Sequence, residues 1–213
     1  MIINIYRDAW RTMMKRPVKL WGLSLLSVLL CSLIALFGVN IPIVTIPVTA
    51  VITAGMSVMF LDGYRGREVS SEQLFDGFKN FKHTAGGMCW KILWIFIWSL
   101  IPAAGIVLGI VKSIAYLFTP YILLEQPNIS ATEALRESIR KTKGIKGQIF
   151  VAVLLPVVAF ALVFTVFALL AFIPVIGSFF ATIDAIITIV YLLFIRLFIG
   201  LVMAGFYDIA KNR

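Results

Sequence analysis

Long apolar segments separated by short basic ones occupy most of the chain. A helix needs about 20 mostly apolar residues to cross the hydrocarbon of a bilayer. The pattern predicts an all-α membrane protein, with a single integral domain over residues 1–213 and six transmembrane helices. The predicted spans cover residues 20–38, 42–61, 88–102, 104–124, 149–172 and 177–206.

The third span is short, so residues 88–124 could also form one long helix. The flanking charges decide between the two interpretations, because positively charged loops stay on the cytoplasmic side of a membrane. Both flanks are basic, which predicts two crossings with a turn near residues 101–105. The flanking bases are Arg65, Arg67, Lys79, Lys82 and Lys91 before the segment, and Arg136, Arg140, Lys141, Lys143 and Lys146 after it.

The same reasoning pairs the other four spans, which predicts three hairpins with both chain termini in the cytoplasm. Of nineteen Lys and Arg residues, only Lys112 and Arg196 fall outside the segments assigned to the cytoplasmic side. The opposite side receives three short turns that each contain an Ile-Pro step, and proline both ends helices and disfavours helical backbone in its predecessor. An acidic residue follows each returning span; these exit acids are Asp62, Glu125 and Asp208.

Three segments beside the spans have the pattern of amphipathic helices, at residues 2–17, 70–82 and 130–143. The last begins with Ser130 and Glu133, which have the spacing of a capping box. Such helices either lie in the headgroup plane or pack beneath the spans as connectors, and their basic faces favour the headgroup plane. Their bases would then form a collar that binds anionic lipid headgroups. The predicted collar residues are Arg7, Arg11, Lys15, Arg16, Lys79, Lys82, Arg140, Lys141 and Lys143.

Composition agrees with a membrane protein. Hydrophobic residues make up 61% of the chain, charged residues 14%, and the mean hydropathy is +1.01. In soluble domains, apolar residues make up about 45–50% and charged residues about 25%. The net charge of +9 comes from bases that flank apolar spans, so membrane lipids are the expected partner and nucleic acid is not. Cys31 and Cys89 lie in apolar stretches without a CxxC motif or a nearby histidine, so no metal or other cofactor is expected.

Three charged residues fall at membrane depth, where each charge costs at least about 2.5–3.5 kcal/mol to insert and therefore needs a partner or a wet cavity. Lys112 and Asp184 each lie seven residues inward from an outer turn, so we predict that they pair across the bundle. Arg196 lies deeper, near the level of Glu125, which is its predicted partner, with Asp62 as the alternative. The pairs would either hold helices in register or line a polar path for a substrate.

The chain contains none of the common catalytic signatures, such as H-E-x-x-H, G-x-S-x-G or a Gly-rich phosphate loop. His83 is the only histidine, and its basic surroundings indicate a surface position. Trp90, Trp94 and Trp98 recur every four residues, the spacing of a lipid-facing or packing ridge along a helix. We therefore expect a protein that is not an enzyme.

Two stretches in the middle of the chain carry longer motifs. The first has LDGYRGREV at residues 61–69 and QLFDGFKNF at residues 73–81. The second has WSLIP at residues 98–102, KSIAY at 112–116 and TPYIL at 119–123, followed by Pro127, Ser130, Glu133-Ala134, Ser138 and Lys143-Gly144. Both stretches resemble the DUF975 family of bacterial integral membrane proteins. Glu125 stands where that family has Asp, and Ile-Pro-Ala at residues 101–103 where it has Ile-Pro-Gly.

The resemblance implies a multi-pass protein of the bacterial cytoplasmic membrane. It implies no particular activity, because the family is named for its unknown function. More distantly, the chain is similar to the membrane domains attached to some glycerophosphodiester phosphodiesterases. The sequence contains no counterpart of their catalytic barrel, so the resemblance does not extend to esterase activity.

Two functions fit these observations. The charges at membrane depth, the prolines inside spans and the basic collar favour a non-enzymatic protein that is transporter-like or interacts with lipids or other amphiphiles. The alternative is an accessory or immunity-type membrane protein that binds an exporter subunit or a peptide toxin. A cavity that reaches Lys112 or Asp184 would favour transport, whereas a dry bundle with a flat apolar face would favour partner binding.

Overall fold

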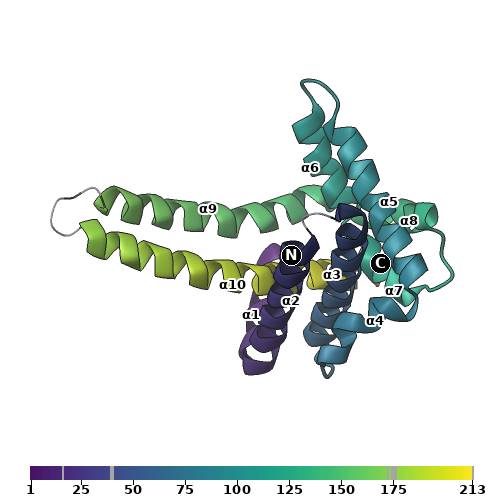
Figure 1. Ribbon diagram of the computed structural model, residues 1–213, viewed down its shortest axis with the longest axis horizontal. Helices are drawn as coiled ribbons and strands as arrows, with labels where there is room; N and C mark the ends of the chain where they lie inside the picture. Colours follow the sequence, from purple (N-terminus) through teal and green to yellow (C-terminus); the bar gives the residue numbers. More distant parts are fainter. Residues whose placement is uncertain (16, 39–40, 172, 174–176, 213) are drawn as a thin grey trace.

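The computed structural model describes residues 1–15, 17–38, 41–171, 173 and 177–212 (Figure 1). Regular structure within these residues is helical throughout, which confirms the all-α prediction. The elements in order are α1 (Ile2–Lys15), α2 (Pro17–Gly38), α3 (Pro42–Tyr64), the 3₁₀ helix η1 (Ser71–Phe75), α4 (Asp76–Lys79), α5 (Phe81–Ser99), α6 (Gly105–Ala115), α7 (Thr119–Glu125), α8 (Ala131–Thr142), α9 (Lys146–Leu170) and α10 (Gly177–Lys211).

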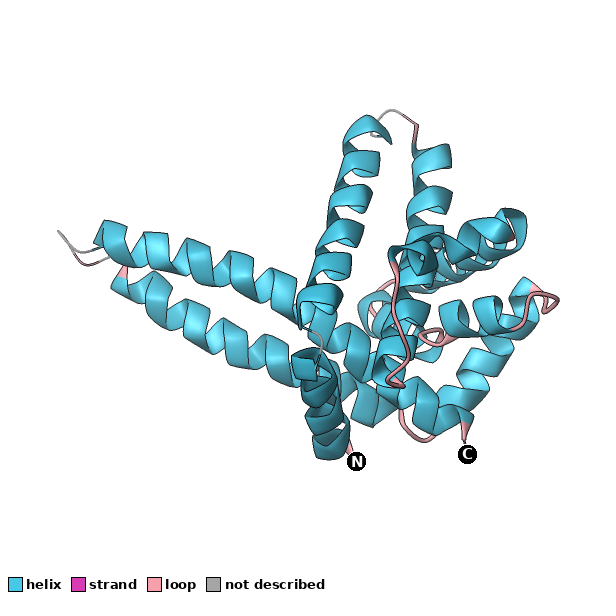
Figure 2. Ribbon diagram, turned by 90° about the horizontal axis from the view of Figure 1, so that it is seen from below, coloured by secondary structure: helices cyan, strands magenta, loops and turns pink. Residues whose placement is uncertain are grey.

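Three helix pairs, α2–α3, α5–α6 and α9–α10, diverge from a shared base. In Figure 1 the α9–α10 pair extends to the left and the α5–α6 pair upward, and Figure 2 shows the α2–α3 pair running in a third direction. The base consists of α1, α7 and α8 together with the ends of α3 and α10 at Tyr64 and Lys211, which pack on one another. Each pair therefore contacts its neighbours mainly near the base.

Five helical segments in the described residues are long and apolar enough to cross a membrane. They are Lys19–Leu36, Pro42–Tyr64, Gly105–Glu125, Lys146–Leu170 and Thr182–Lys211. Helix α5, which covers residues 88–99 of the predicted span 88–102, is not among them, and it includes the polar residues Lys82, His83 and Lys91. The prediction of several apolar membrane-compatible helices is confirmed, and the six-span topology stays a prediction.

The predicted break within residues 88–124 is present. Helix α5 ends at Ser99 and α6 begins at Gly105, and the two helices pack side by side. The intervening turn is closed by a backbone hydrogen bond of 2.8 Å from Gly105 N to the Ile101 carbonyl oxygen. Ala103 in this turn has a φ of 64°. The other two predicted turns, at residues 40–42 and 173–177, lie partly outside the described residues.

The predicted span over residues 104–124 corresponds to the membrane-length segment Gly105–Glu125. Within it the chain leaves the helix at residues 116–118, between α6 and α7. Pro120 explains the break, since proline is tolerated in the first turn of a helix and disrupts a helix interior. It lies in the first turn of α7. The Ser138 hydroxyl of α8 accepts a hydrogen bond from the Phe118 amide (3.1 Å) and donates one to the Ala115 carbonyl (2.8 Å), which satisfies backbone groups at the break.

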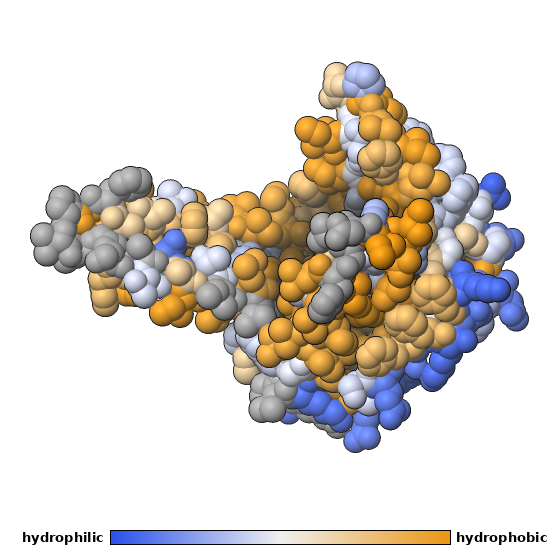
Figure 3. All heavy atoms as spheres, viewed as in Figure 1, coloured by the Kyte–Doolittle hydropathy of each residue, from blue (hydrophilic) through white to orange (hydrophobic). Residues whose placement is uncertain are grey.

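The amphipathic segments are helical, with one corrected boundary. The predicted segment 70–82 divides into η1 and α4, and residues 81–82 already belong to α5. The predicted capping box is confirmed: the Ser130 hydroxyl accepts from the Glu133 amide (3.3 Å), and the Glu133 carboxylate accepts from the Ser130 amide (3.1 Å). Hydrophilic side chains gather at the base, on the side of α4 and α8, and apolar side chains cover the diverging pairs (Figure 3).

Helix α3 packs directly on the backbone of η1 at Gly55. A Cβ atom added to Gly55 would collide with the carbonyl oxygens of Leu74 and Gln73. We expect Gly55→Ala to lower the free energy of unfolding by about 1–3 kcal/mol, because overpacking forces the backbone apart. Gly86→Ala in α5 is the matched control, since nothing lies within 4 Å of its added Cβ. Thermal unfolding in detergent measures both, and an unchanged midpoint for Gly55→Ala contradicts this packing.

Candidate functional site

An ion network joins the ends of three helices at the base. The Arg65 guanidinium, just after α3, donates through Nε to Asp208 Oδ1 at 2.6 Å, and its Nη1 lies 3.5 Å from Glu125 Oε1. Glu125 Oε2 also accepts hydrogen bonds from the Tyr207 hydroxyl (2.8 Å) and from Lys211 Nζ (2.7 Å). The network therefore connects α3, α7 and α10.

The charged groups of this network are half-buried, so their pairing contributes to the structure. The Arg65 side chain is 17% exposed. Desolvation by itself lowers the pKa of Arg65, but the hydrogen bond and charge of Asp208, with those of Glu125, outweigh it and raise that pKa above its ordinary value. The third exit acid, Asp62, is also paired, with Arg67 at 3.1 Å and Gln73 at 2.9 Å. All three exit acids thus have protein partners.

The predicted Glu125–Arg196 pair is wrong. Glu125 binds Arg65 and Lys211, while the Arg196 Nη2 atom lies 3.8 Å from the Met56 sulfur. Arg196 precedes Lys211 by fifteen residues in α10, which corresponds to about 22 Å along the helix axis. A carboxylate held at Lys211 is therefore beyond the reach of Arg196. The sequence feature that could have identified Arg65 as a partner is its position directly after α3, three residues beyond the exit acid Asp62.

The structure also does not bring Lys112 and Asp184 together. Lys112 Nζ lies 4.0 Å from the centroid of the Trp98 ring, in the geometry of a cation–π contact. Asp184 Oδ1 is buried and has no hydrogen-bond partner in the described residues. Equal depth along the sequence does not produce a contact here, because the α5–α6 and α9–α10 pairs diverge (Figure 1).

Most of the predicted collar lies on the surface. Lys141 is the exception, because it is half-buried and lies 3.5 Å from Glu137. Arg16 lies outside the described residues. The exposed members are Arg7, Arg11, Lys15, Lys79, Lys82, Arg140 and Lys143.

Two half-buried cations share a cavity of about 310 Å³ between α3, α5, α7 and α10. They are Lys91 of α5 and Arg196 of α10, and within the described residues no carboxylate lies within 4 Å of either. We call this space the cationic cavity. Sequence reasoning assigned Lys91 to a cytoplasmic flank, but α5 begins at Phe81 and carries Lys91 ten residues into the helix.

The rest of the cationic cavity is largely apolar. Polar groups in its wall include the Thr53 and Ser57 hydroxyls, which already donate to carbonyl oxygens within α3 at 2.8 and 2.9 Å. The remaining lining residues are Met56, Phe60, Met88, Leu117, Pro120, Tyr121, Ile195, Ile199, Gly200 and Met203. An uncompensated charge in such surroundings carries the insertion cost of about 2.5–3.5 kcal/mol or more. The cavity therefore favours an anionic occupant.

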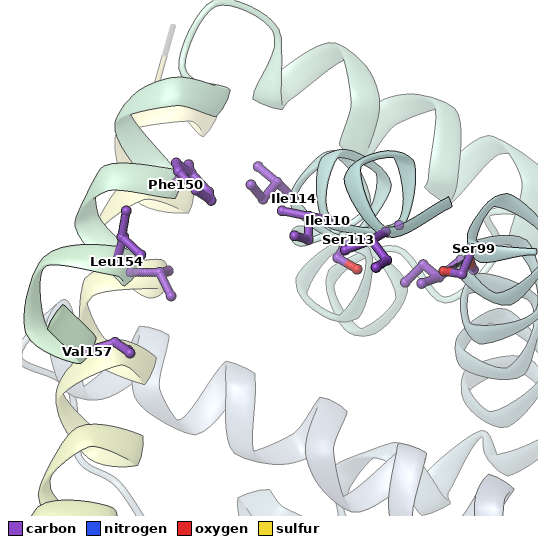
Figure 4. Close-up of a pocket in the computed structure, with 11 residues that line it drawn as sticks. Ser99, Ile110, Ser113, Ile114, Phe150, Leu154 and Val157 are labelled. Carbon is purple, nitrogen blue, oxygen red and sulfur yellow. Dashed lines mark hydrogen bonds between the residues drawn. The ribbon is translucent and has the colours of Figure 1, made fainter. Parts of the chain in front are cut away.

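A second, larger cavity lies in the angle between the α5–α6 pair and α9. It has a volume of about 520 Å³, and we call it the apolar cleft. Figure 4 shows Phe150, Leu154 and Val157 on one side, facing Ile110 and other α6 side chains across the cleft. Among the described residues, the polar side chains in its lining are those of Ser99 and Ser113. The lining residues are Ile95, Ser99, Ile106, Gly109, Ile110, Ser113, Ile114, Phe150, Val153, Leu154 and Val157.

Helix α5 contributes to both cavities, although the two have no lining residue in common. Lys91 lines the cationic cavity and Ile95, one turn further along α5, lines the apolar cleft. The opposite walls come from α10 and α9, which pack together through a stack of Phe160 on Tyr191 with ring centroids 3.6 Å apart. The Tyr191 hydroxyl also donates to the Pro156 carbonyl at 3.2 Å. Along α5, the charged space and the apolar space therefore lie about one helical turn apart.

No protein-family model, curated protein or solved structure matches this chain. The resemblance to the DUF975 family therefore stays a prediction from the motifs.

The ion network at the base predicts a large effect of Arg65. We expect Arg65→Gln to lower the free energy of unfolding by about 1–3 kcal/mol, because Asp208 and Glu125 lose a half-buried counter-charge. Arg67→Gln is the matched control: Arg67 also pairs with an exit acid, but its side chain is 65% exposed, and exposed pairs contribute about 0–1 kcal/mol. Thermal unfolding in detergent compares the two. Equal losses are the outcome that contradicts a stabilising network.

Proposed function

We propose that this chain is a non-enzymatic multi-pass membrane protein that binds the apolar part of a lipid or similar amphiphile in the apolar cleft. The observation that carries the proposal is the cleft itself, about 520 Å³ of space lined almost wholly by aliphatic and aromatic side chains. Water gains few hydrogen bonds in an apolar space, whereas an acyl chain gains van der Waals contacts with apolar walls. An amphiphile from the bilayer is the natural occupant.

The chemistry of the lining supports binding over catalysis. Its hydroxyl groups come from Ser99 and Ser113, and the Ser99 hydroxyl already donates to the Ile95 carbonyl at 2.8 Å. A nucleophilic serine needs a general base within hydrogen-bond reach. No histidine, carboxylate or amine lines this cleft among the described residues. The site is therefore suited to holding a ligand, as a transporter-like or lipid-interacting protein does.

The proposed membrane arrangement follows from the charges. In it, the chain lies in a bacterial cytoplasmic membrane with six spans and both termini in the cytoplasm. The exposed collar residues and the hydrophilic side of the base (Figure 3) support contact with anionic headgroups on that side. Large apolar side chains exposed along the diverging pairs, such as Leu36, Ile106 and Leu162, support contact with lipid tails.

The cleft is tested by filling it. We expect Leu154→Trp to lower retention of co-purified lipid about tenfold, because the indole would occupy space in the cleft that the lipid needs. A loss of about 1.4 kcal/mol of binding free energy corresponds to a tenfold loss of affinity. Leu162→Trp is the matched control, since Leu162 also belongs to α9 but is 65% exposed and does not line the cleft. Native mass spectrometry after detergent exchange counts the lipids retained.

Two outcomes would contradict the proposal. In one, the unmodified protein retains no lipid, or Leu154→Trp and Leu162→Trp retain as much as it does. In the other, the retained mass is a protein or peptide that Leu154→Trp displaces, which would favour the accessory or immunity-type function.

A further inference from the structure

The cationic cavity has a chemistry that the apolar cleft lacks. We infer that Lys91 and Arg196 bind the anionic headgroup of a phospholipid whose acyl chain lies in the apolar cleft. The inference rests on the proposed function and narrows its ligand class from amphiphiles in general to anionic phospholipids. Its basis is the juxtaposition of two unpaired cations with an apolar space along the same helix.

The charge balance of the described residues supports an anionic ligand. The carboxylates at the base already have partners: Arg65 and Lys211 bind Glu125, and Arg65 also binds Asp208. Lys112 has the Trp98 ring as its neighbour. Lys91 and Arg196 face one cavity with no carboxylate within 4 Å in the described chain, so that cavity carries a net positive charge. A phosphate group supplies the missing countercharge and accepts hydrogen bonds from both side chains.

The spacing of the two sites matches one bound molecule. Lys91 in the cationic cavity and Ile95 in the apolar cleft are four residues apart on α5, which is about 6 Å along the helix axis. A phospholipid joins its phosphate to its acyl chains through a short glycerol unit, so it can occupy both spaces. A free anion would fill only the first.

The hydroxyl groups of the cavity indicate the kind of selectivity. Thr53 and Ser57 already donate their protons to carbonyl oxygens of α3. These two hydroxyls are therefore not available as donors to a headgroup, which leaves Lys91 and Arg196, with the Tyr121 hydroxyl, to recognise it. The site should distinguish anionic from zwitterionic lipids by charge, and should bind phosphatidylglycerol and phosphatidylserine about equally.

The test uses the full chain in mixed micelles with equimolar phosphatidylglycerol and phosphatidylcholine of matched acyl chains. Native mass spectrometry measures the ratio of the two lipids bound. We expect phosphatidylglycerol to be enriched, by about fivefold for each cation that contacts it. Added inorganic phosphate should leave the enrichment unchanged, because the free ion lacks the acyl chains. Displacement of phosphatidylglycerol by phosphate at equal concentration would overturn the inference in favour of a free-anion site.

Substitutions assign the preference to the two cations. Lys91→Gln with Arg196→Gln should remove the enrichment while phosphatidylcholine retention persists. Lys112→Gln is the matched control, because Lys112 is a half-buried cation on the neighbouring helix and lines neither cavity. The exchange Lys91→Arg with Arg196→Lys keeps the charges and should keep the enrichment, which separates charge from a general loss of folding.

The outcomes separate this inference from the proposed function. If the unmodified protein retains no lipid, the proposed function fails and the inference fails with it. If both lipids bind equally and Leu154→Trp displaces both, the cleft binds amphiphiles and the headgroup assignment is wrong. Enrichment that persists in the double Gln variant, or that Lys112→Gln abolishes, also overturns the assignment.

Discussion

The arrangement of this molecule depends on the cost of an unpaired charge in an apolar environment. A charged side chain at membrane depth needs an opposite charge, an aromatic face or a polar ligand nearby. At the base, burial imposes a similar requirement, and the half-buried Arg65 pairs with Asp208 and Glu125, which joins the ends of α3, α7 and α10. The three helix pairs diverge from the point at which these charges neutralise one another (Figure 1).

Away from the base, the same requirement is met in different ways. Lys112 lies over the Trp98 ring, which offers a negative face without a carboxylate. Lys91 and Arg196 have no such neighbour in the described residues and line one cavity instead. A protein built only for stability would gain from replacing these two cations by apolar residues of similar volume. Their presence beside an apolar cleft is the physical basis for assigning them to a ligand.

Divergence of the helix pairs has a second consequence, which is the unfilled angle between them. Of the 25 residues in α9, the buried ones are Ile149 and Ala152, both near the base. The rest of this helix packs on α10 along one side and leaves its other sides uncovered by the described chain. Lipid covers those sides in a bilayer, and the apolar cleft in Figure 4 offers it apolar walls from α5, α6 and α9.

The sequence by itself determined the helical class, the apolar segments, the break between Ser99 and Gly105 and the capping box at Ser130, because each depends on residues close together in the chain. Only the tertiary structure decided which charges meet. Counting residues from a turn measures depth along a helix, but contact also depends on the direction in which each helix pair points. For that reason the predicted partners of Lys112 and Arg196 were wrong, and the shared cavity of Lys91 and Arg196 was not visible in the sequence.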